Sequence, residues 1–289
     1  MRHTRNIGIL FVFLIAVITF VLGIAAPNLW ASGSHRHQPK VEKFEEADIY
    51  FELNNTDGDL GIHGKVDGGP WTKIWLQDSH RRKLMEVKAK GRLRRQGVTE
   101  LFFESAEPTF DEVSPERFFN RFPEGKYRIF GESQDGGRLI GKFFVWHVMP
   151  AAPDGIEVSG TAIDLETVDC EEEAPVVVPD EDGNIVISWD PVTTSHPDLG
   201  AEGDIEAALY QLVVEIDLEI DGREFTSVYS VDLPPDVTSM MVPEAFINIG
   251  LDDEGNGEYK FEILVKEEVG GNQTATESCF AIGEEDGDE

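Results

Sequence analysis

The sequence has few cysteines and few basic residues. Two cysteines, Cys170 and Cys279, occur in 289 residues, which excludes a disulfide-dense scaffold and any cysteine-rich zinc module. Lys and Arg number 24 against 56 Asp and Glu, for a formal net charge of −32. Because this charge repels polyanions, we expect no nucleic-acid partner and no anionic membrane surface as a partner of the whole molecule.

Motifs for catalysis and metal binding are also missing. There is no Gly-x-Ser-x-Gly elbow and no phosphate-binding glycine loop followed by Lys-Ser/Thr. Histidines beyond the N-terminal tail stand apart in the sequence, without an i,i+4 pair or a nearby cysteine: His63, His80, His147 and His196. Carboxylate pairs such as Glu104 with Glu107 are expected by chance among so many acids. We predict no catalytic residue, no metal site and no cofactor.

Two Asp-rich segments, Asp57-Gly58-Asp59 and residues 180–183, invite a comparison with calcium loops. An EF-hand loop needs oxygen ligands at positions 1, 3 and 5, Gly at 6 and an acid at 12. With Gly58 or Gly183 at position 6, position 1 is Leu53 or Val178, so both alignments fail. The segments are predicted as hairpin turns. Adventitious ion binding by the many carboxylates stays open.

The N-terminus carries an export segment. Arg2 and Arg5 precede an uncharged apolar run over residues 7–26, and the small residue Ala31 offers a cleavage site. We predict a signal peptide over residues 1–31 and a disordered tail over 32–43. An uncleaved anchor is the alternative, since about 20 apolar residues also span a bilayer. Either way the remainder lies outside the cytoplasm, and the protein is secreted, periplasmic or on the cell surface.

The charge changes abruptly in the middle of the chain. Residues 41–150 carry 17 Lys and Arg against 19 Asp and Glu, whereas residues 151–289 carry 3 against 37. The prolines at 150 and 153 lie at this change, which predicts a boundary with a linker over residues 150–173. With 40% hydrophobic residues, the chain can bury cores, and its length suggests two domains.

The front half, residues 44–149, is predicted as a β-sandwich. Short runs rich in β-branched and aromatic residues, such as residues 72–76 and 126–130, are separated by Asp-Gly turns. One segment differs, because Ser114 and Pro115 precede apolar residues at helical spacing. It predicts a short helix over residues 114–122.

The back half resembles a fibronectin type III domain over residues 174–282. Trp189 stands inside an alternating strand, Tyr259 opens a Tyr-x-Phe-x-x-x-Val strand, and an Asn-Gln-Thr strand ends the domain. The resemblance implies that Trp189 and Tyr259 are the core tryptophan and the tyrosine corner. Residues 193–208 form a longer loop than such a domain needs, and residues 283–289 form an acidic tail.

The front half resembles segments of uncharacterised exported bacterial proteins that end in a fibronectin type III domain. Segments that carry this likeness include residues 55–61, 91–97, 99–106 and 122–127. The resemblance implies an architecture and no activity. The fold class is therefore all-β, with two tandem β-sandwich domains after an N-terminal signal or anchor helix.

The two cysteines bracket the back domain. Cys170 precedes its first strand and Cys279 lies in its last. In an exported chain we predict a Cys170–Cys279 disulfide, which would close a loop of about 110 residues and contribute about 4–5 kcal/mol in the chain-entropy model. Two unpaired thiols are the alternative.

Residues 81–95 concentrate cations in an otherwise acidic chain. Read as a hairpin, the segment would align basic side chains on one face. The candidate interaction residues are Arg81, Arg82, Lys88, Lys90, Arg92, Arg94 and Arg95. The alternative is a solvated strand face with edge-protecting charges. As a docking surface the segment would bind the chain's own acidic half, a second copy, or an acidic polysaccharide.

The leading functional hypothesis is a non-enzymatic, exported interaction or adhesion-type module of the cell envelope, with a protein or an acidic polysaccharide as partner. The alternative is a carbohydrate-binding accessory protein. Its candidate stacking platforms are Trp71, Trp75 and Trp146, unless these side chains belong to the core. A membrane contact is expected only through an uncleaved N-terminal segment.

Overall fold

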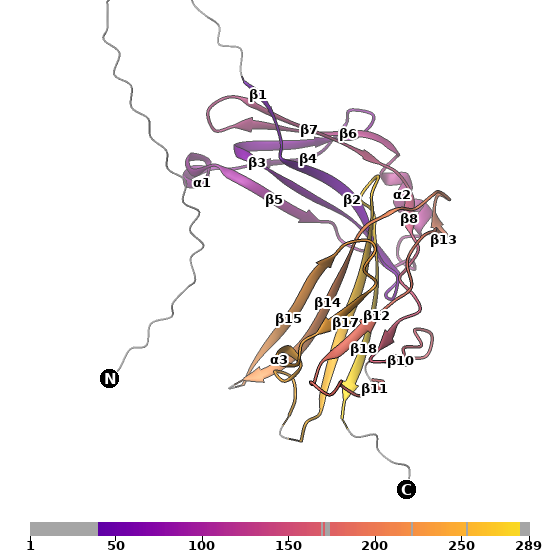
Figure 1. Ribbon diagram of the computed structural model, residues 1–289. Coiled ribbons are helices and arrows are strands. Elements are labelled where there is room, and N and C mark those ends of the chain that lie inside the picture. The colour runs from indigo at the N-terminus through magenta and orange to yellow at the C-terminus, as the bar shows by residue number, and fades with distance from the viewer. Residues whose placement is uncertain (1–39, 169, 171–173, 221, 253, 284–289) are drawn as a thin grey trace, which may run out of the picture. The chain divides into compact units, whose positions relative to one another are not determined.

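The computed structural model describes residues 40–168, 170, 174–220, 222–252 and 254–283. The predicted signal peptide, most of the predicted disordered tail and the end of the acidic tail lie outside these residues. Among the described residues no helix has both the length and the apolar character to cross a membrane. The fold is all-β, as predicted, with three short helices in the part of the chain that is described (Figure 1).

The first half of the described chain contains eight strands and two helices. They are β1 (Val41–Lys43), β2 (Glu46–Asn54), β3 (Asp59–Gln77), β4 (Lys83–Lys88), α1 (Gly91–Gln96), β5 (Val98–Glu104), α2 (Pro115–Arg121), β6 (Gly125–Ser133), β7 (Arg138–Val145) and β8 (Val148–Pro150). Asp57-Gly58 forms the turn between the antiparallel strands β2 and β3, as predicted.

The second half contains ten strands and one helix among its described residues. They are β9 (Glu157–Val158), β10 (Thr161–Ala162), β11 (Val176–Val177), β12 (Ile185–Ser188), β13 (Ser195–Gly200), β14 (Ala207–Ile220), β15 (Arg223–Leu233), β16 (Ser239–Val242), α3 (Glu244–Ile247), β17 (Gly257–Glu267) and β18 (Gln273–Ile282).

Strand β3 organises the front sandwich because it pairs on both sides of a break. Its first part, up to Asp67, pairs with β2 and β5, and its second part, from Trp71 on, pairs with β4 and β6. The break is one of pairing: the register shifts between Asp67 and Trp71, at Gly68-Gly69-Pro70, while β3 itself continues to Gln77. Glycine and proline favour such a break. One strand thereby contributes to both layers.

The predicted helix is α2. Its N-cap Ser114 accepts a hydrogen bond from the backbone N–H of Arg117, and Pro115 occupies the first turn. The helix buries Phe118 and Phe119 edge-on against Phe51 of β2, with ring centroids 5.7 and 5.4 Å apart. A local cap and an aromatic face therefore fix this helix over the sheet.

The back half is a sandwich of two sheets. One has the order β10-β9-β12-β16, and the other places β18, β17, β14 and β15 side by side (Figure 1). Trp189 is buried between them, edge-on to Tyr210 at 5.4 Å. The hydroxyl of Tyr259 donates a hydrogen bond to the carbonyl of Ile247, 2.5 Å away and twelve residues upstream.

A single sheet continues from one half into the other. Strand β18 pairs in parallel with β2, with Gln273 opposite Glu52 and Ala275 opposite Asn54. The predicted linker is only partly a linker, because β9 and β10 lie within residues 150–173 and bury Val158 in the back core. The chain folds back there because Val158 is apolar and pairs with Ile187 of β12. The exact domain boundaries stay a prediction.

The long loop over residues 193–208 contacts the front half. It contains β13, which pairs with β8, and Leu199, which packs in the front core. His196 Nε2 lies 3.0 Å from Asn55 Oδ1 of the β2–β3 turn. The inserted loop therefore adds contacts between the halves.

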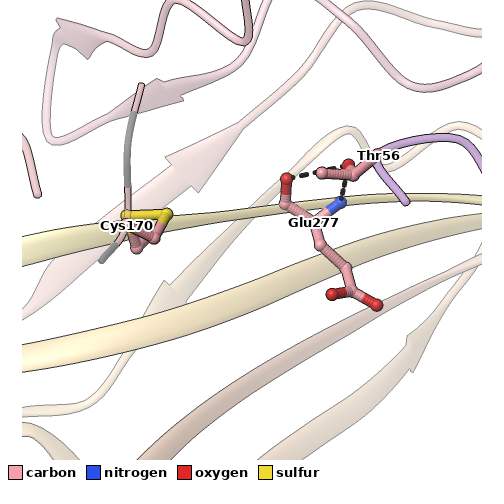
Figure 2. Close-up of a disulfide and its surroundings, with 4 residues drawn as sticks. Thr56, Cys170 and Glu277 are labelled. Atoms are coloured by element: carbon pink, nitrogen blue, oxygen red, sulfur yellow. Dashed lines mark hydrogen bonds between the residues drawn. A yellow bond between two sulfur atoms is a disulfide. The ribbon is translucent and has the colours of Figure 1, made fainter. Parts of the chain in front are cut away.

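Cys170 and Cys279 form a disulfide in the structure, with Cα atoms 5.8 Å apart. Figure 2 shows this bond beside the contact between Thr56 and Glu277. The Thr56 hydroxyl donates to the carbonyl of Glu277 and accepts from its backbone N–H, at 3.0 and 2.9 Å. The turn after β2 is thus attached to β18 close to the disulfide.

Candidate functional site

The basic segment 81–95 is not the predicted hairpin. It forms β4, then a two-residue connection, then α1. The chain turns at Gly91, which has a φ of 55°, and the helix ends at Gly97, whose N–H bonds to the carbonyl of Leu93. Glycines at both ends favour a helical turn over a second strand. The expected alternation of Lys88, Lys90, Arg92 and Arg94 along one strand face is therefore wrong.

The predicted interaction residues are nevertheless all exposed: Arg81, Arg82, Lys88, Lys90, Arg92, Arg94 and Arg95. Arg82 pairs with the buried Asp78 at 2.7 Å. Among the described residues the other six make no ion pair within 4.0 Å. The basic segment therefore does not dock on the acidic half within the described chain, and its cations are available to another molecule.

The strand register extends this basic segment into a larger surface. On the outer face of β4, β3, β6 and β7, residues lie directly opposite one another in three rows. The first row contains Lys88, Lys73, Glu132 and Arg138; the second contains Glu86, Trp75, Phe130 and Ile140; the third contains Lys83, Gln77, Arg128 and Lys142. Opposed residues share a face, so cations flank a central aromatic row.

We name this surface the cationic face. Its basic residues are Lys73, Lys83, Lys88, Arg94, Arg95, Lys126, Arg128, Arg138 and Lys142. The acids on these outward strand positions are Glu86 and Glu132. A hydrogen bond from Lys83, together with Lys73, lowers the pKa of Glu86, so Glu86 is ionised at neutral pH and offsets part of the charge.

A groove of about 1010 Å³ lies on the cationic face. The rings of Trp75 and Phe130 form part of its lining, stacked 5.4 Å apart with an interplanar angle of 20°. Arg94, Arg95 and Arg138 also line it. The arginines of α1 are held there because Gln134, in the β6–β7 turn, donates a side-chain hydrogen bond to the carbonyl of Arg95.

The three tryptophans predicted as stacking platforms occupy different environments. Trp71 is 1% exposed and belongs to the front core. Trp146 donates an indole hydrogen bond to Glu267 at 3.0 Å, between the halves. Trp75 is half-buried in the groove, with Lys73 Nζ 5.1 Å from its ring centroid. One of the three can therefore serve as a platform, with Phe130 as its neighbour.

The groove combines two kinds of recognition. Arginine donates paired hydrogen bonds to carboxylate or sulfate oxygens, and flat aromatic rings stack on the apolar face of a planar or ring-shaped ligand. A ligand that offers both features is a ring bearing an acidic group. The contribution of β6 and β7 could not be found from the sequence, because their cations are isolated along the chain and meet β3 only through long-range pairing.

A second group was also missed. His63, predicted to stand alone, lies with Glu104 and Glu107 in a cluster whose potential ligand atoms are within 4.8 Å of one another. The sequence does not indicate this cluster, because His63 is more than 40 positions from both glutamates and comes beside them only when β3 pairs with β5. This cluster is separate from the cationic groove.

No protein-family model and no curated protein matches the chain. Among solved structures, a 1.5-MDa bacterial ice-binding adhesin matches at 12% identity over 85% of this chain and 66% of the other, with a TM-score of 0.23. The BSP domain of a biofilm-associated protein matches at 12% identity over 85% of this chain and 30% of the other, with a TM-score of 0.23. Alpha-2-macroglobulin from Escherichia coli matches at 11% identity over 82% of this chain and 15% of the other, also with a TM-score of 0.23. The chain spans less than two thirds of each protein, and at these TM-scores the likeness carries no functional argument.

Proposed function

We propose that this protein is an exported, non-enzymatic interaction module of the adhesion type that binds an acidic polysaccharide of the cell envelope. The observation that carries the proposal is the arginine-lined groove over Trp75 and Phe130. Export and cleavage after Ala31 are part of the proposal and concern residues outside those described.

The charge distribution supports an anionic ligand that is small in cross-section. The whole chain carries −32, so a long, stiff polyanion such as duplex DNA would meet repulsion outside the cationic face. A flexible polysaccharide can place a few sugar rings in the groove and leave the acidic half alone. The groove is open to solvent, as the middle of a long chain requires.

We also propose that the back half is a fibronectin type III domain. Its strand order, the buried Trp189 and the hydrogen bond from Tyr259 to Ile247 support the assignment. In this proposal the back domain holds the front domain in place through β18 and does not itself contact the ligand.

The experiment is a calorimetric titration of the exported protein with oligogalacturonate, with neutral dextran oligosaccharides as the comparison. We expect binding of the acidic sugar and none of the neutral one. The triple variant Arg94→Glu, Arg95→Glu, Arg138→Glu should weaken binding at least tenfold, because each charged hydrogen bond contributes about 1.5–3 kcal/mol when formed with good geometry. Trp75→Ala should weaken it about fivefold or more.

The matched control changes the net charge by the same amount at residues outside the groove. Arg81→Glu, Lys90→Glu, Arg92→Glu alters three exposed cations that do not line the groove. Equal losses in the two triple variants would mean a diffuse charge effect, and the groove would not be the site. Binding of neutral dextran with unchanged affinity in the groove triple variant would favour the carbohydrate-binding alternative.

A further inference from the structure

His63 is a buried histidine with carboxylates at both ring nitrogens. It is 4% exposed and lies on β3, directly opposite Glu104 at the end of β5. Nε2 lies 2.7 Å from Oε1 of Glu107, and Nδ1 lies 3.4 Å from Oε2 of Glu52 on β2. The rings of Tyr50 and Phe102 lie beside the imidazole, with centroids 5.7 and 6.0 Å away.

The fold makes room for Glu107 at this position. A Cβ built on Gly61 would lie 2.1 Å from Oε1 of Glu107, so any side chain at position 61 would displace the carboxylate. Ser105 fixes the turn that carries Glu107, because its backbone N–H bonds to the carbonyl of Ile62 and its hydroxyl accepts from the N–H of Ile62. Glycine at 61 and serine at 105 thus direct this carboxylate to His63.

The arrangement of two carboxylates around one imidazole favours a cation. A neutral imidazole has one N–H and one lone pair, so it can donate to one of the two carboxylates but meets the other with a lone pair. A metal ion between the ring and a carboxylate would replace this unfavourable contact with a favourable one. With the proton on Nδ1, which faces Glu52 at 3.4 Å, Nε2 is the free nitrogen, and proteins orient metal-binding histidines by a carboxylate in this way.

We propose that His63, Glu104 and Glu107 bind a divalent transition-metal ion of the zinc type, with Glu52 orienting the imidazole. The donor set of one nitrogen and two carboxylates suits Zn²⁺, whereas Ca²⁺ takes oxygen ligands alone. Zinc ligands lie about 3.3 Å apart in a tetrahedron with bonds of about 2.0 Å. The three groups already lie within 4.8 Å of one another, so modest side-chain rotations bring them to that spacing.

The position of the site indicates what the metal would do. Glu107 follows β5, His63 belongs to β3, and Glu52 lies opposite Gln273 of β18, where the two halves join. A bound ion would cross-link β3 to the end of β5 and neutralise charge beside this joint. Metal binding would therefore stabilise the front sandwich, independently of the polysaccharide groove.

The test is a titration of the exported protein, purified without a histidine tag, with Zn²⁺ and with Co²⁺ as a spectroscopic probe. We expect one saturable site, Co²⁺ absorption bands of a nitrogen- and oxygen-ligated ion, and a raised melting temperature. Glu107→Gln and His63→Gln should each weaken Zn²⁺ binding at least tenfold. If the buried His63→Gln variant does not fold, the Zn²⁺ affinity of Glu107→Gln alone tests the site.

Three controls separate this site from adventitious binding. Glu100→Gln removes an exposed carboxylate from the same strand as Glu104, His80→Gln removes an exposed histidine, and His35→Gln, His37→Gln removes the tail pair. Each should bind Zn²⁺ as the unaltered protein does. Unchanged affinity and stoichiometry in Glu107→Gln would overturn the proposal. So would an imidazole that stays doubly protonated and shows no change in its ¹⁵N signals when Zn²⁺ is added.

Discussion

Glu262 illustrates how the net charge acts on single residues. It lies on β17 directly opposite Glu277 of β18. Burial, followed by the charges of Glu277, Glu52 and Glu215, raises the pKa of Glu262 to about 7. The folded protein therefore retains a proton on Glu262 between about pH 4.5 and 7, whereas the unfolded chain has released it. Stability must fall as the pH rises through this window, because the folded state binds more protons there.

Replacement of Glu262 by Gln should remove the loss of stability that the ionised Glu262 carboxylate causes. We expect Glu262→Gln to raise the free energy of unfolding at pH 8 by about 1–3 kcal/mol and to change it little at pH 4, where the native carboxyl is already neutral. Urea unfolding at the two pH values measures the difference. Glu258→Gln, an exposed residue of the same strand, is the control. An equal gain at both pH values would show that charge at position 262 is not the cause.

At the scale of elements, the joint between the halves depends on β18 and the turn before it. The side chain of Asn272 accepts a hydrogen bond from the N–H of Phe51 and donates to the carbonyls of Trp146 and Val148, at 3.0, 3.1 and 2.9 Å. Thr274 and Thr276 donate to the carbonyls of Pro150 and Pro153. The segment predicted as a stiff linker is therefore bound along β18.

Asn272→Ala should destabilise the protein strongly. The substitution leaves two buried backbone groups and one part-buried carbonyl without their partner, and each unsatisfied buried group costs about 1–3 kcal/mol, part of which local water can recover. We expect a loss of about 2–4 kcal/mol in chemical denaturation, against less than about 0.5 kcal/mol for the exposed Asn248→Ala. A loss as small as that of the control would mean that the halves are held together by other contacts.

The disulfide is the second element-scale constraint on the back half. Cys170 and Cys279 are 109 residues apart in sequence, so the bond restricts the unfolded chain considerably. We expect the exported protein, unfolded without reductant, to show no free thiol, and the Cys170→Ser, Cys279→Ser variant to lose about 2–5 kcal/mol of stability. Two titratable thiols in the untreated protein would refute the bond.

Elements specified by local sequence were predictable, and elements that depend on pairing were not. Ser114 and Pro115 predict α2, and Asp57-Gly58 predicts the β2–β3 turn, because helix caps and tight turns are determined by a few neighbouring residues. The cationic face and the His63 cluster arise when β3 pairs with β4, β5 and β6. Register between distant strands is a property of the packed sheet, and a basic segment read by itself cannot reveal it.

At the scale of the whole molecule, the charge is divided between two surfaces. The back half carries 37 acids against 3 cations, while the cationic face lies on the front sheet. Among the described residues, the exposed cations of segment 81–95 other than Arg82 and Lys83 make no ion pair within the chain, and Lys83 pairs only with Glu86 of the same segment. The cationic face of one copy can therefore attract the acidic half of another.

Weak self-association should follow at low salt. Exposed ion pairs contribute only about 0–1 kcal/mol each, and the screening length falls from about 10 Å at 0.1 M to about 3 Å at 1 M salt. In sedimentation experiments we expect the average mass to rise with concentration at 0.05 M salt and to return to the monomer at 1 M. The Arg92→Glu, Arg94→Glu, Arg95→Glu variant should stay monomeric. Salt-independent mass would show that the segment is a solvated surface.

Binding of an acidic sugar in the groove over Trp75 can be followed by an NMR titration of the indole N–H signals during addition of an oligogalacturonate. We expect a saturable shift of the Trp75 signal and no shift of the Trp71 and Trp189 signals, since these two indoles are buried in the cores. The Arg94→Glu, Arg95→Glu, Arg138→Glu variant should lose the Trp75 shift. An unmoved Trp75 signal, while other signals shift with saturation, would place the ligand elsewhere and show that the groove is not its binding site.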